Sequence, residues 1–356
     1  MEEASDMRDC IRVLVVGTGQ MGAGIARLIM AKPGLKLTGA FGRREQRSGI
    51  DLGQAIGLGR DTGIVVDNDL RHAIQHSRPQ VAIQATCSRL DDAMPEITTL
   101  LQHGVHVISI AEQMAWPAAT SAAKARQLQQ LAIDHRATLL GTGINPGFVL
   151  DLLIIALSGV CSDIESISAT RINDLSPYGP SVLASQGVGL SPEAFHRGLR
   201  EGTVVGHFGF AESIRMIAAA TGWGIERIEE TREPILAKVR RQTPLASVDP
   251  GQVAGCRHTA VAYRENKPVI TLIHPQQVLP QTEGIETGDR IEIRGTPDIN
   301  LAGSPEIPGG QGTVALAVNM IPRVLNAAPG LYSMADLPVP SAMLGDVRQL
   351  ITLEAR

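Results

Sequence analysis

Apolar positions in the first part of the chain fall into short continuous runs, and these alternate with longer stretches in which apolar residues recur at helical spacing. The runs occupy residues 13–16, 35–41, 64–66, 81–85, 105–109 and 137–140. Between them, helical spacing with a polar face covers residues 23–30, 69–76, 91–103 and 118–135. Strands that alternate with helices form a parallel sheet. The pattern therefore predicts an α/β domain built on a parallel sheet.

A glycine-rich turn follows the first apolar run and has the spacing Gly-x-Gly-x-x-Gly. In a Rossmann domain, Gly17 permits the tight turn, Gly19 lets the backbone approach a pyrophosphate, and Gly22 lets the next helix pack closely on the strand. The phosphates then lie on free N–H groups at the helix N-terminus. We therefore expect Gly17, Gly19, Gln20, Met21 and Gly22 to bind a dinucleotide.

The end of the second run indicates which dinucleotide. NAD-binding domains usually place an acidic residue about 20 residues beyond the glycines, where it binds the ribose hydroxyls. This chain has Gly42, Arg43 and Arg44 there. Two guanidiniums suit a 2′-phosphate, because the planar fork of arginine binds phosphate through two hydrogen bonds. We expect Arg43 and Arg44 to bind NADP, with NAD also possible; the alternative is a solvated arginine pair on a loop.

The second half of the chain has a different pattern. Apolar or alternating runs predict strands at 164–171, 253–263, 269–274 and 290–294, and helices at 192–200 and 212–221. This order fits an antiparallel sheet with helices on one face. The glycine-rich residues 141–148 lead into the apolar helix predicted at 149–157, and a second glycine-rich segment, 307–312, precedes an apolar helix predicted at 313–325. We therefore expect a Rossmann domain at 1–145, an α+β substrate and dimerisation domain at 146–312, and a C-terminal helix and tail at 313–356 that return to the first domain.

Ligands of parallel sheets lie beyond the carboxyl ends of the strands. This rule directs attention to Ala85, Thr86 and Ala111 as cofactor contacts, and to Glu112, which directly follows an apolar strand. Because its neighbours are apolar, the Glu112 carboxyl is expected to have a raised pKa and to act as a general base. The alternative is a solvated residue at the start of a helix.

Polar residues near the predicted domain boundary are candidates for substrate binding. Asn145, between glycines at the expected cleft, could bind a nicotinamide carboxamide or a substrate, or could be a structural turn residue. Alternation places Arg171 and Asn173 on one face of a strand, where they could bind a carboxylate, while Asp174 could bind an ammonium group. A structural salt bridge is the alternative. His258 is a further candidate, although a lone strand histidine is more often structural.

Composition narrows the functional classes. The 356 residues carry a net charge of −4 without a basic tract, so neither nucleic acid nor an anionic membrane is an expected partner. The N-terminus lacks a signal pattern, and no apolar run approaches the roughly 20 residues of a membrane span, so we expect a cytoplasmic protein. The four cysteines lack metal-ligand spacing, and His72 and His76 lack the glutamate of a zinc motif, so no metal is expected. A nucleophilic Cys87 is a minor alternative, because no partner histidine is recognisable.

Four longer segments carry a family resemblance. Residues 141–149, 171–177, 250–258 and 334–340 resemble the 2,4-diaminopentanoate dehydrogenase family, in the same order and over nearly the whole chain. These segments, above all Asn-Pro-Gly-Phe and Asn-Asp-Leu-Ser-Pro, indicate a family far more specifically than the glycine spacing does. The family is grouped with the native amine dehydrogenases, whose fold resembles dihydrodipicolinate reductase.

The resemblance implies an activity and a site. It implies NAD(P)⁺-dependent oxidative deamination of the C4 amine of 2,4-diaminopentanoate, an intermediate of ornithine fermentation, to 2-amino-4-oxopentanoate and ammonia. It also implies a homodimer or larger homo-oligomer formed through the α+β sheet, and it gives Glu112 the place of the catalytic glutamate. The chain departs from many relatives at Gln113, where they have a second acid, and at the end of the second strand, where they often have Asp.

Two other functions remain open at this stage. An amine dehydrogenase or reductive aminase acting on simple amines or ketones would have little use for the polar set Arg171, Asn173 and Asp174. A non-catalytic NADP-binding sensor would be favoured if Glu112 were remote from the ligand.

Overall fold

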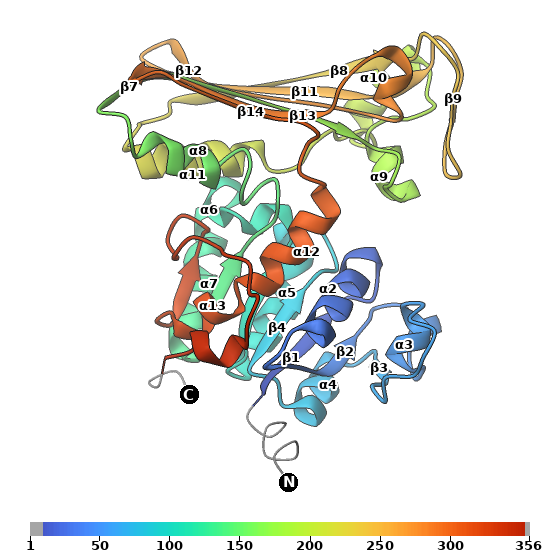
Figure 1. Cartoon of the computed structure of the whole chain (residues 1–356), viewed down its shortest axis with the longest axis vertical. Helices are drawn as coiled ribbons and strands as arrows, with labels where there is room; N and C mark the ends of the chain where they lie inside the picture. The colour runs from blue at the N-terminus through green and yellow to red at the C-terminus, as the bar shows by residue number, and fades with distance from the viewer. Residues whose placement is uncertain (1–9, 353–356) are drawn as a thin grey trace. The chain divides into compact units, whose positions relative to one another are not determined.

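The computed structural model describes residues 10–352 and divides the chain into two compact units (Figure 1). The first unit comprises the chain up to Phe148 together with the chain from Gly309 onward, and the second comprises Val149–Pro308. The second unit is therefore inserted into the sequence of the first. Within the described residues, none of the helices combines the length and apolar character needed to cross a membrane.

The first unit contains a seven-stranded sheet in the order β15-β6-β5-β4-β1-β2-β3, with every neighbouring pair parallel. The six strands before β15 follow the Rossmann order. The strands are β1 (Ile11–Val16), β2 (Leu35–Phe41), β3 (Val66–Asp67), β4 (Val81–Gln84), β5 (His106–Ser109), β6 (Thr138–Gly141) and β15 (Gly330–Tyr332). The central strands are buried on both faces, because their residues are apolar without alternation.

Helices complete the first unit. They are α2 (Gln20–Ala31), α3 (Leu52–Ala55), α4 (Leu70–Ser77), α5 (Leu90–Gln102), α6 (Pro117–Thr120), α7 (Ala122–Asp134), α12 (Gly309–Asn319) and α13 (Ile321–Asn326), with single 3₁₀ turns η1 (Glu45–Arg47), η2 (Glu112–Met114) and η4 (Val347–Leu350). Although α12 is distant in sequence, it packs on α2 (Figure 1), and a Cβ at Gly24 would lie 2.8 Å from the Val314 side chain. Residues near the C-terminus thus belong to the nucleotide-binding unit.

Two long predicted helices are each interrupted. The helix predicted at 118–135 is divided at Ser121, which is extended (φ −156°, ψ 107°) and accepts a hydrogen bond from Lys124 N–H as the N-cap of α7. A serine that caps a helix competes with continuing the preceding one. The helix predicted at 313–325 is divided between α12 and α13 at Met320, just before Pro322 in the first turn of α13.

The second unit contains a six-stranded sheet in the order β14-β13-β7-β12-β11-β8. Its strands are β7 (Asp163–Asp174), β8 (Arg227–Leu236), β11 (Val253–Arg264), β12 (Lys267–Gln277), β13 (Gly288–Thr296) and β14 (Ile299–Gly303), and a separate ribbon pairs β9 (Arg241–Gln242) with β10 (Ser247–Val248). The sheet is mixed, because β7 and β12 are parallel while the other pairs are antiparallel. The prediction of a purely antiparallel sheet was therefore wrong. The long helical connection between β7 and β8 brings the chain back, so that β8 and later β12 run in the same direction as β7. A parallel pair such as β7 and β12 needs a crossover of this kind.

The helices of the second unit are α8 (Leu152–Ser158), α9 (Pro180–Ser185), α10 (Pro192–Glu201) and α11 (Phe210–Thr221), with one 3₁₀ turn, η3 (Pro280–Glu283). Helices α8 and α11 lie side by side along one face of the sheet (Figure 1). Asp151 joins them, because one carboxylate oxygen caps Leu152 N–H and the other accepts from Ser213 Oγ at 2.8 Å. The helix predicted at 149–157 therefore begins at this buried cap.

Candidate active site

The glycine turn after β1 fits a bound pyrophosphate. Gly17 has φ +115°, and a Cβ there would lie 2.6 Å from the carbonyl oxygen of Ala85. A Cβ at Gly22 would lie 1.7 Å from the Gly17 carbonyl oxygen, whereas one at Gly19 would meet nothing within 4 Å. The turn is therefore closed on its inner side and open at Gly19, where Gln20 and Met21 begin α2. The backbone N–H groups at such a helix start suit a dinucleotide phosphate.

Glu112 lies close to where the sequence pattern placed it, three residues beyond the end of β5, as the first residue of η2. Its carboxylate is part of a half-buried residue, and the flanking Ala111 and Met114 are fully buried. The turn packs tightly against β6, because a Cβ at Gly141 would lie 1.7 Å from the Met114 carbonyl oxygen. Gln113 caps α5, because its Oε1 accepts Leu90 N–H at 2.8 Å. The backbone that carries Glu112 is thus held on two sides.

The other predicted cofactor residues of this unit follow neighbouring strands. Ala85 and Thr86 follow β4, Ala111 follows β5, and Asn145 lies beyond β6 in a loop whose Ile144 N–H donates to Thr313 Oγ1 at 3.1 Å. Because β4, β5 and β6 are adjacent parallel strands, these residues share the carboxyl edge of the sheet with the glycine turn and Glu112.

Arg43 and Arg44 follow β2 at the same edge, and both are exposed. Arg43 Nε donates to Glu96 Oε1 at 2.6 Å, and Arg43 Nη2 donates to the Asp92 carbonyl oxygen at 2.8 Å. Glu96 lies on α5 and is buried. The predicted contact of Arg43 and Arg44 with a 2′-phosphate stays a prediction, and the structure adds a carboxylate partner to one of the two.

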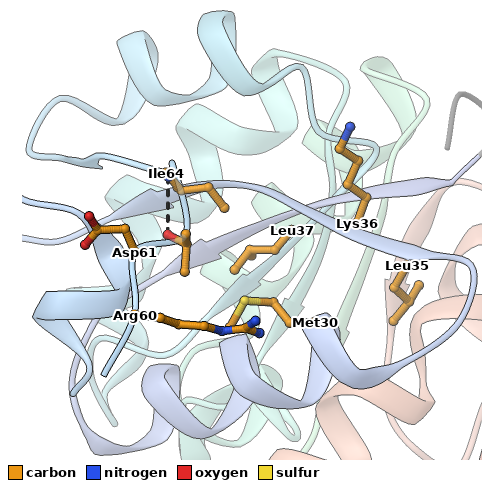
Figure 2. A pocket seen from close by; sticks show the side chains of 8 residues that line it. Met30, Leu35, Lys36, Leu37, Arg60, Asp61 and Ile64 are labelled. Carbon is orange, nitrogen blue, oxygen red and sulfur yellow. Dashed lines mark hydrogen bonds between the residues drawn. The ribbon is translucent and has the colours of Figure 1, made fainter. Parts of the chain in front are cut away.

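A hollow of about 340 Å³ in the same unit lies elsewhere (Figure 2). Its lining includes Leu35 and Leu37 at the start of β2 and Arg60 from the loop after α3, while Ile64 N–H donates to Thr62 Oγ1 at 3.2 Å beside it. Since Leu35 and Leu37 lie in the amino-terminal half of β2, the hollow does not lie at the carboxyl edge of the sheet.

In the second unit, Arg171 is almost completely buried and paired. Its Nη1 donates to Asp289 Oδ1 at 2.6 Å, and its Nη2 donates to the Ile307 carbonyl oxygen. The other oxygen of Asp289 accepts Ile307 N–H at 2.9 Å. The salt bridge that sequence reasoning offered as an alternative is therefore present.

Asn173 and His274 form a second buried polar pair on adjacent strands. His274 Nε2 lies 2.8 Å from Asn173 Oδ1, which assigns the ring proton to that nitrogen. The His207 ring contacts the His274 ring with centroids 4.7 Å apart, and Phe210 contacts His207 at 4.8 Å. These groups form a buried polar region between β7, β12 and the start of α11.

His258 has partners at both ring nitrogens. Its Nδ1 accepts His207 N–H at 3.1 Å, so the ring proton lies on Nε2 and points at Glu230 Oε2, 3.1 Å away. Glu230 also pairs with Arg232. His258 is 1% exposed, and it holds the segment that carries the His207 ring.

Asp174, the predicted ammonium ligand, closes a turn after β7. One oxygen accepts Ser176 N–H at 2.8 Å, Ser176 Oγ at 2.5 Å and Leu279 N–H at 3.0 Å. Two of these donors belong to the nearby Ser176 and the third to Leu279, 105 residues away in sequence. The predicted binding of an ammonium group by Asp174 stays a prediction.

Burial lowers the pKa of all three histidines in this region. The pKa of His207 and that of His274 lie well below the usual value, because burial disfavours the charged ring and the Arg171 guanidinium repels it. The pKa of His258 is lowered by burial, although its hydrogen bond with Glu230 opposes the shift. All three rings are therefore neutral at pH 7.

This arrangement predicts that the protein loses stability as the pH falls below about 6.5. A free histidine titrates near 6.5, so below that pH the unfolded chain binds protons that the native rings reject. The stabilisation is complete above about pH 6.5 and declines below it. His258→Gln keeps an N–H donor for Glu230 but removes one titrating ring. Between pH 7.5 and 5.5 the Tm of this variant is therefore expected to fall less than the Tm of the wild type. His196→Gln, on the exposed face of α10, is the control, and identical profiles for both variants would contradict this reasoning.

The remaining sequence candidates have structural surroundings. Burial raises the pKa of the Cys87 thiol, which keeps it protonated and argues against a nucleophile. His72 Nδ1 pairs with Asp67 on the surface. In the part of the chain that the structure describes, no three His, Cys, Asp or Glu side chains are grouped to hold a metal ion.

Sequence reasoning missed three polar groups of these regions. His274 could have been found, because alternation in its strand places it on the buried face with Ile270 and Leu272. Tyr178, whose pKa is raised by burial, lies in a turn with no periodic pattern. Glu96 gave no signal either, since its partner Arg43 is 53 residues away.

Comparisons with known proteins agree along the whole chain. Residues 148–353 match the family model of the 2,4-diaminopentanoate dehydrogenase C-terminal domain, and residues 11–110 match that of the dihydrodipicolinate reductase N-terminus. The chain is 41% identical to 2,4-diaminopentanoate dehydrogenase of Acetoanaerobium sticklandii, over 97% of this chain and 98% of the relative. It is 26% identical to an amine dehydrogenase of Streptomyces virginiae, over 94% and 98%. The structure of an amine dehydrogenase from Mycobacterium smegmatis superposes with a TM-score of 0.84 at 27% identity, covering 94% and 98%.

The Rossmann sheet and the open glycine turn, together with the named dehydrogenase relatives, place the chain in the dehydrogenase class of oxidoreductases, which use a nicotinamide dinucleotide. Its named relatives act on amines. The chain belongs to the 2,4-diaminopentanoate dehydrogenase family.

Proposed function

We propose that this protein catalyses the NAD(P)⁺-dependent oxidative deamination of 2,4-diaminopentanoate at C4, giving 2-amino-4-oxopentanoate and ammonia. The observation that carries the proposal is the 41% identity to 2,4-diaminopentanoate dehydrogenase over 97% of the chain. Identity to the amine dehydrogenase relative is lower, at 26%. The buried ionic and polar groups around Arg171 and Asn173 also favour a charged substrate over a simple amine.

The carboxyl edge of the parallel sheet holds the cofactor in this proposal. The start of α2 beyond Gly19 receives the pyrophosphate, and the turn of Arg43 and Arg44 receives the 2′-phosphate of NADP. Thr86 and Asn145, with the backbone at Ala85 and Ala111, contact the nicotinamide half. When bound, the nicotinamide supplies the hydride acceptor of the reaction.

Glu112 supplies the proton transfers. The C4 amine arrives as an ammonium group, which has no lone pair to expel a hydride, so its proton must first be removed. Glu112 takes this proton and releases it to solvent. After the hydride has left C4, Glu112 takes a proton from the water that attacks the C4 iminium carbon and returns it to the amine nitrogen. It then takes the proton of the new hydroxyl group as ammonia leaves and the ketone forms. Gln113 cannot share this work, because an amide is not a base and its oxygen caps α5, so one carboxylate performs all the transfers.

The second unit recognises the substrate carboxylate. Arg171 contributes its positive charge while remaining bonded to Asp289, and the neutral Asn173–His274 pair contributes hydrogen-bonding groups. A buried cation with polar neighbours offsets the desolvation of the carboxylate. His258 supports this region through the segment that carries His207, and Asp174 is positioned beside Asn173 on β7.

The expected substrate profile tests this function. With NADP⁺, purified protein should form NADPH rapidly with 2,4-diaminopentanoate and at least about 100-fold less efficiently, by kcat/KM, with pentan-2-amine, which has no carboxylate. Ornithine and lysine, which have no amine at C4, should be poor substrates. A site built to pair a charge rejects an analogue without it, because its own charge is then uncompensated. Equal efficiency with pentan-2-amine would favour the simple amine dehydrogenase, and tight NADP binding without turnover would favour the sensor.

A further inference from the structure

Three arginines follow β2 within five residues, and their guanidiniums have different surroundings. Arg47 Nη1 donates to the carbonyl oxygen of Thr18, inside the glycine turn. Arg43 is paired with Glu96. Arg44 is exposed, and no side chain among residues 10–352 pairs with its guanidinium. Of the two arginines predicted to bind a 2′-phosphate, one is thus neutralised and the other is available.

The carboxylate that neutralises Arg43 is buried and held on both oxygens. The Glu96 side chain is 7% exposed, compared with 45% for Arg43. Glu96 Oε1 accepts from Arg43 Nε at 2.6 Å, and Oε2 accepts from Thr86 Oγ1 at 2.5 Å and from Gln84 Nε2 at 3.3 Å. A carboxylate with this many donors has a defined position.

The same network continues into the sheet. Gln84, the last residue of β4, accepts from Ser109 Oγ of β5 at 2.6 Å through its Oε1. A continuous hydrogen-bonded path therefore connects the end of β5 to Arg43, through β4 and α5. Glu96 is therefore held in place by residues at the carboxyl edge of the sheet, and its contact with Arg43 is not an isolated surface ion pair.

We propose that Glu96 determines the dinucleotide preference of this protein by neutralising Arg43, so that Arg44 alone receives the 2′-phosphate of NADP and NAD is also accepted. The inference rests on the proposed function, because it assumes that a dinucleotide binds at this edge. It assigns a role to Glu96, which lies on α5 and outside the glycine turn and the β2 turn.

The physical reason is the net charge near the 2′ position. Because the 2′-phosphate is strongly anionic, the affinity of the protein for NADP depends on the sum of the charges near this phosphate. The Arg43–Glu96 pair contributes almost no net charge, whereas Arg44 contributes one. NAD has uncharged hydroxyl groups at that end, so the affinity of the protein for NAD should not depend on these charges.

The test measures dissociation constants for NADP⁺ and NAD⁺ by calorimetry, without turnover. Glu96→Gln keeps an oxygen to accept from Arg43 but removes the negative charge, so it should tighten NADP⁺ binding about tenfold and change NAD⁺ binding less than about twofold. Arg44→Ala should weaken NADP⁺ binding by at least about tenfold and leave NAD⁺ binding unchanged.

A double variant and a charge control make the test specific. Arg43→Gln/Glu96→Gln removes a neutral pair, so its ratio of NADP⁺ to NAD⁺ affinity should stay within about twofold of the wild type, even if Glu96→Gln alone folds poorly. Asp134→Asn, at the exposed last position of α7, changes the net charge equally but lies away from the β2 turn, so it should leave the ratio unchanged.

Three results would overturn the inference. They are an unchanged ratio in Glu96→Gln, a loss of NADP⁺ binding in the double variant, and an Asp134→Asn effect as large as that of Glu96→Gln. If the wild type binds neither dinucleotide, the cofactor assignment fails and the inference fails with it. If it binds both and the ratios do not respond, only the role of Glu96 is rejected.

Discussion

The Glu112→Gln variant is expected to retain NADP⁺ binding and to lose about 10²- to 10⁴-fold in kcat, the usual effect of removing a general base. Glutamine keeps the size of the side chain but cannot accept the ammonium proton. The backbone around it should be unaffected, since Gln113 and Gly141 hold the turn through contacts that do not involve the Glu112 carboxylate. The glycine turn and the β2 turn, which hold the phosphates in our proposal, are separate from Glu112 in the sequence.

The pH dependence of the defect separates a base from a merely structural residue. As the pH approaches about 10, where alkyl ammonium groups lose their proton unaided, single-turnover NADPH formation by the variant should approach that of the wild type. The dissociation constant for NADP⁺, measured in parallel, should not change. An unaltered kcat would exclude Glu112 as the base. His258 and Asp174 would then be the next candidates for the base, although both have structural partners.

Arg171→Met is expected to lower the free energy of unfolding of the protein by about 3–5 kcal/mol, the usual cost of removing one partner of a buried ion pair. The reason is the fate of Asp289, whose side chain is 11% exposed. Without Arg171 its carboxylate keeps the Ile307 N–H but has no compensating cation. Denaturant unfolding followed by circular dichroism measures the loss.

Replacing both members of the pair distinguishes a structural from a recognition role. Arg171→Met/Asp289→Leu removes both charges, so much of the stability should return. If Arg171 also provides charge for the substrate, the double variant should still show a KM for 2,4-diaminopentanoate raised at least about tenfold, with little change for pentan-2-amine. A stable double variant with wild-type KM for both amines would show that Arg171 is only structural.

The first unit was largely predictable from sequence because its signals are local. Strand β2 has the predicted bounds, Leu35–Phe41, and Asp69 caps α4 at the predicted start. Buried parallel strands are continuous apolar runs, and such runs need no knowledge of their neighbours to be recognised. For the same reason the position of Glu112 after β5 followed from the pattern alone.

The second unit was less predictable because its edge strands lack such a pattern. Half of the residues of strand β8, Arg227–Leu236, are charged, and the strand is largely exposed. Strand β14, Ile299–Gly303, is also exposed, so neither strand has a clear apolar face. The parallel pairing of β7 with β12 depends on the path of a long connection, which periodicity does not encode.

The partners of charged residues were also beyond local reasoning. Arg43 and Glu96 are 53 residues apart in sequence, and Arg171 and Asp289 are 118 apart. The sequence indicated that arginines stood at these strand ends, but whether each guanidinium is available to a ligand depends on a carboxylate contributed by another element.

The return of the chain from Gly309 to the first unit affects how the protein is made. Strand β15 pairs with β6, and α12 packs on α2, so the parallel sheet acquires its seventh strand only from the last part of the polypeptide. At synthesis rates of roughly 5–20 residues per second, translating the segment from Gly309 to Tyr332, the last residue of β15, takes roughly 1–5 s after the inserted unit has been synthesised. During that interval the nascent chain exposes the edge of β6 and the α2 surface that α12 covers, and release of a prematurely terminated chain would leave both uncovered. A nonsense mutation late in the coding sequence would therefore damage the domain that begins at the N-terminus.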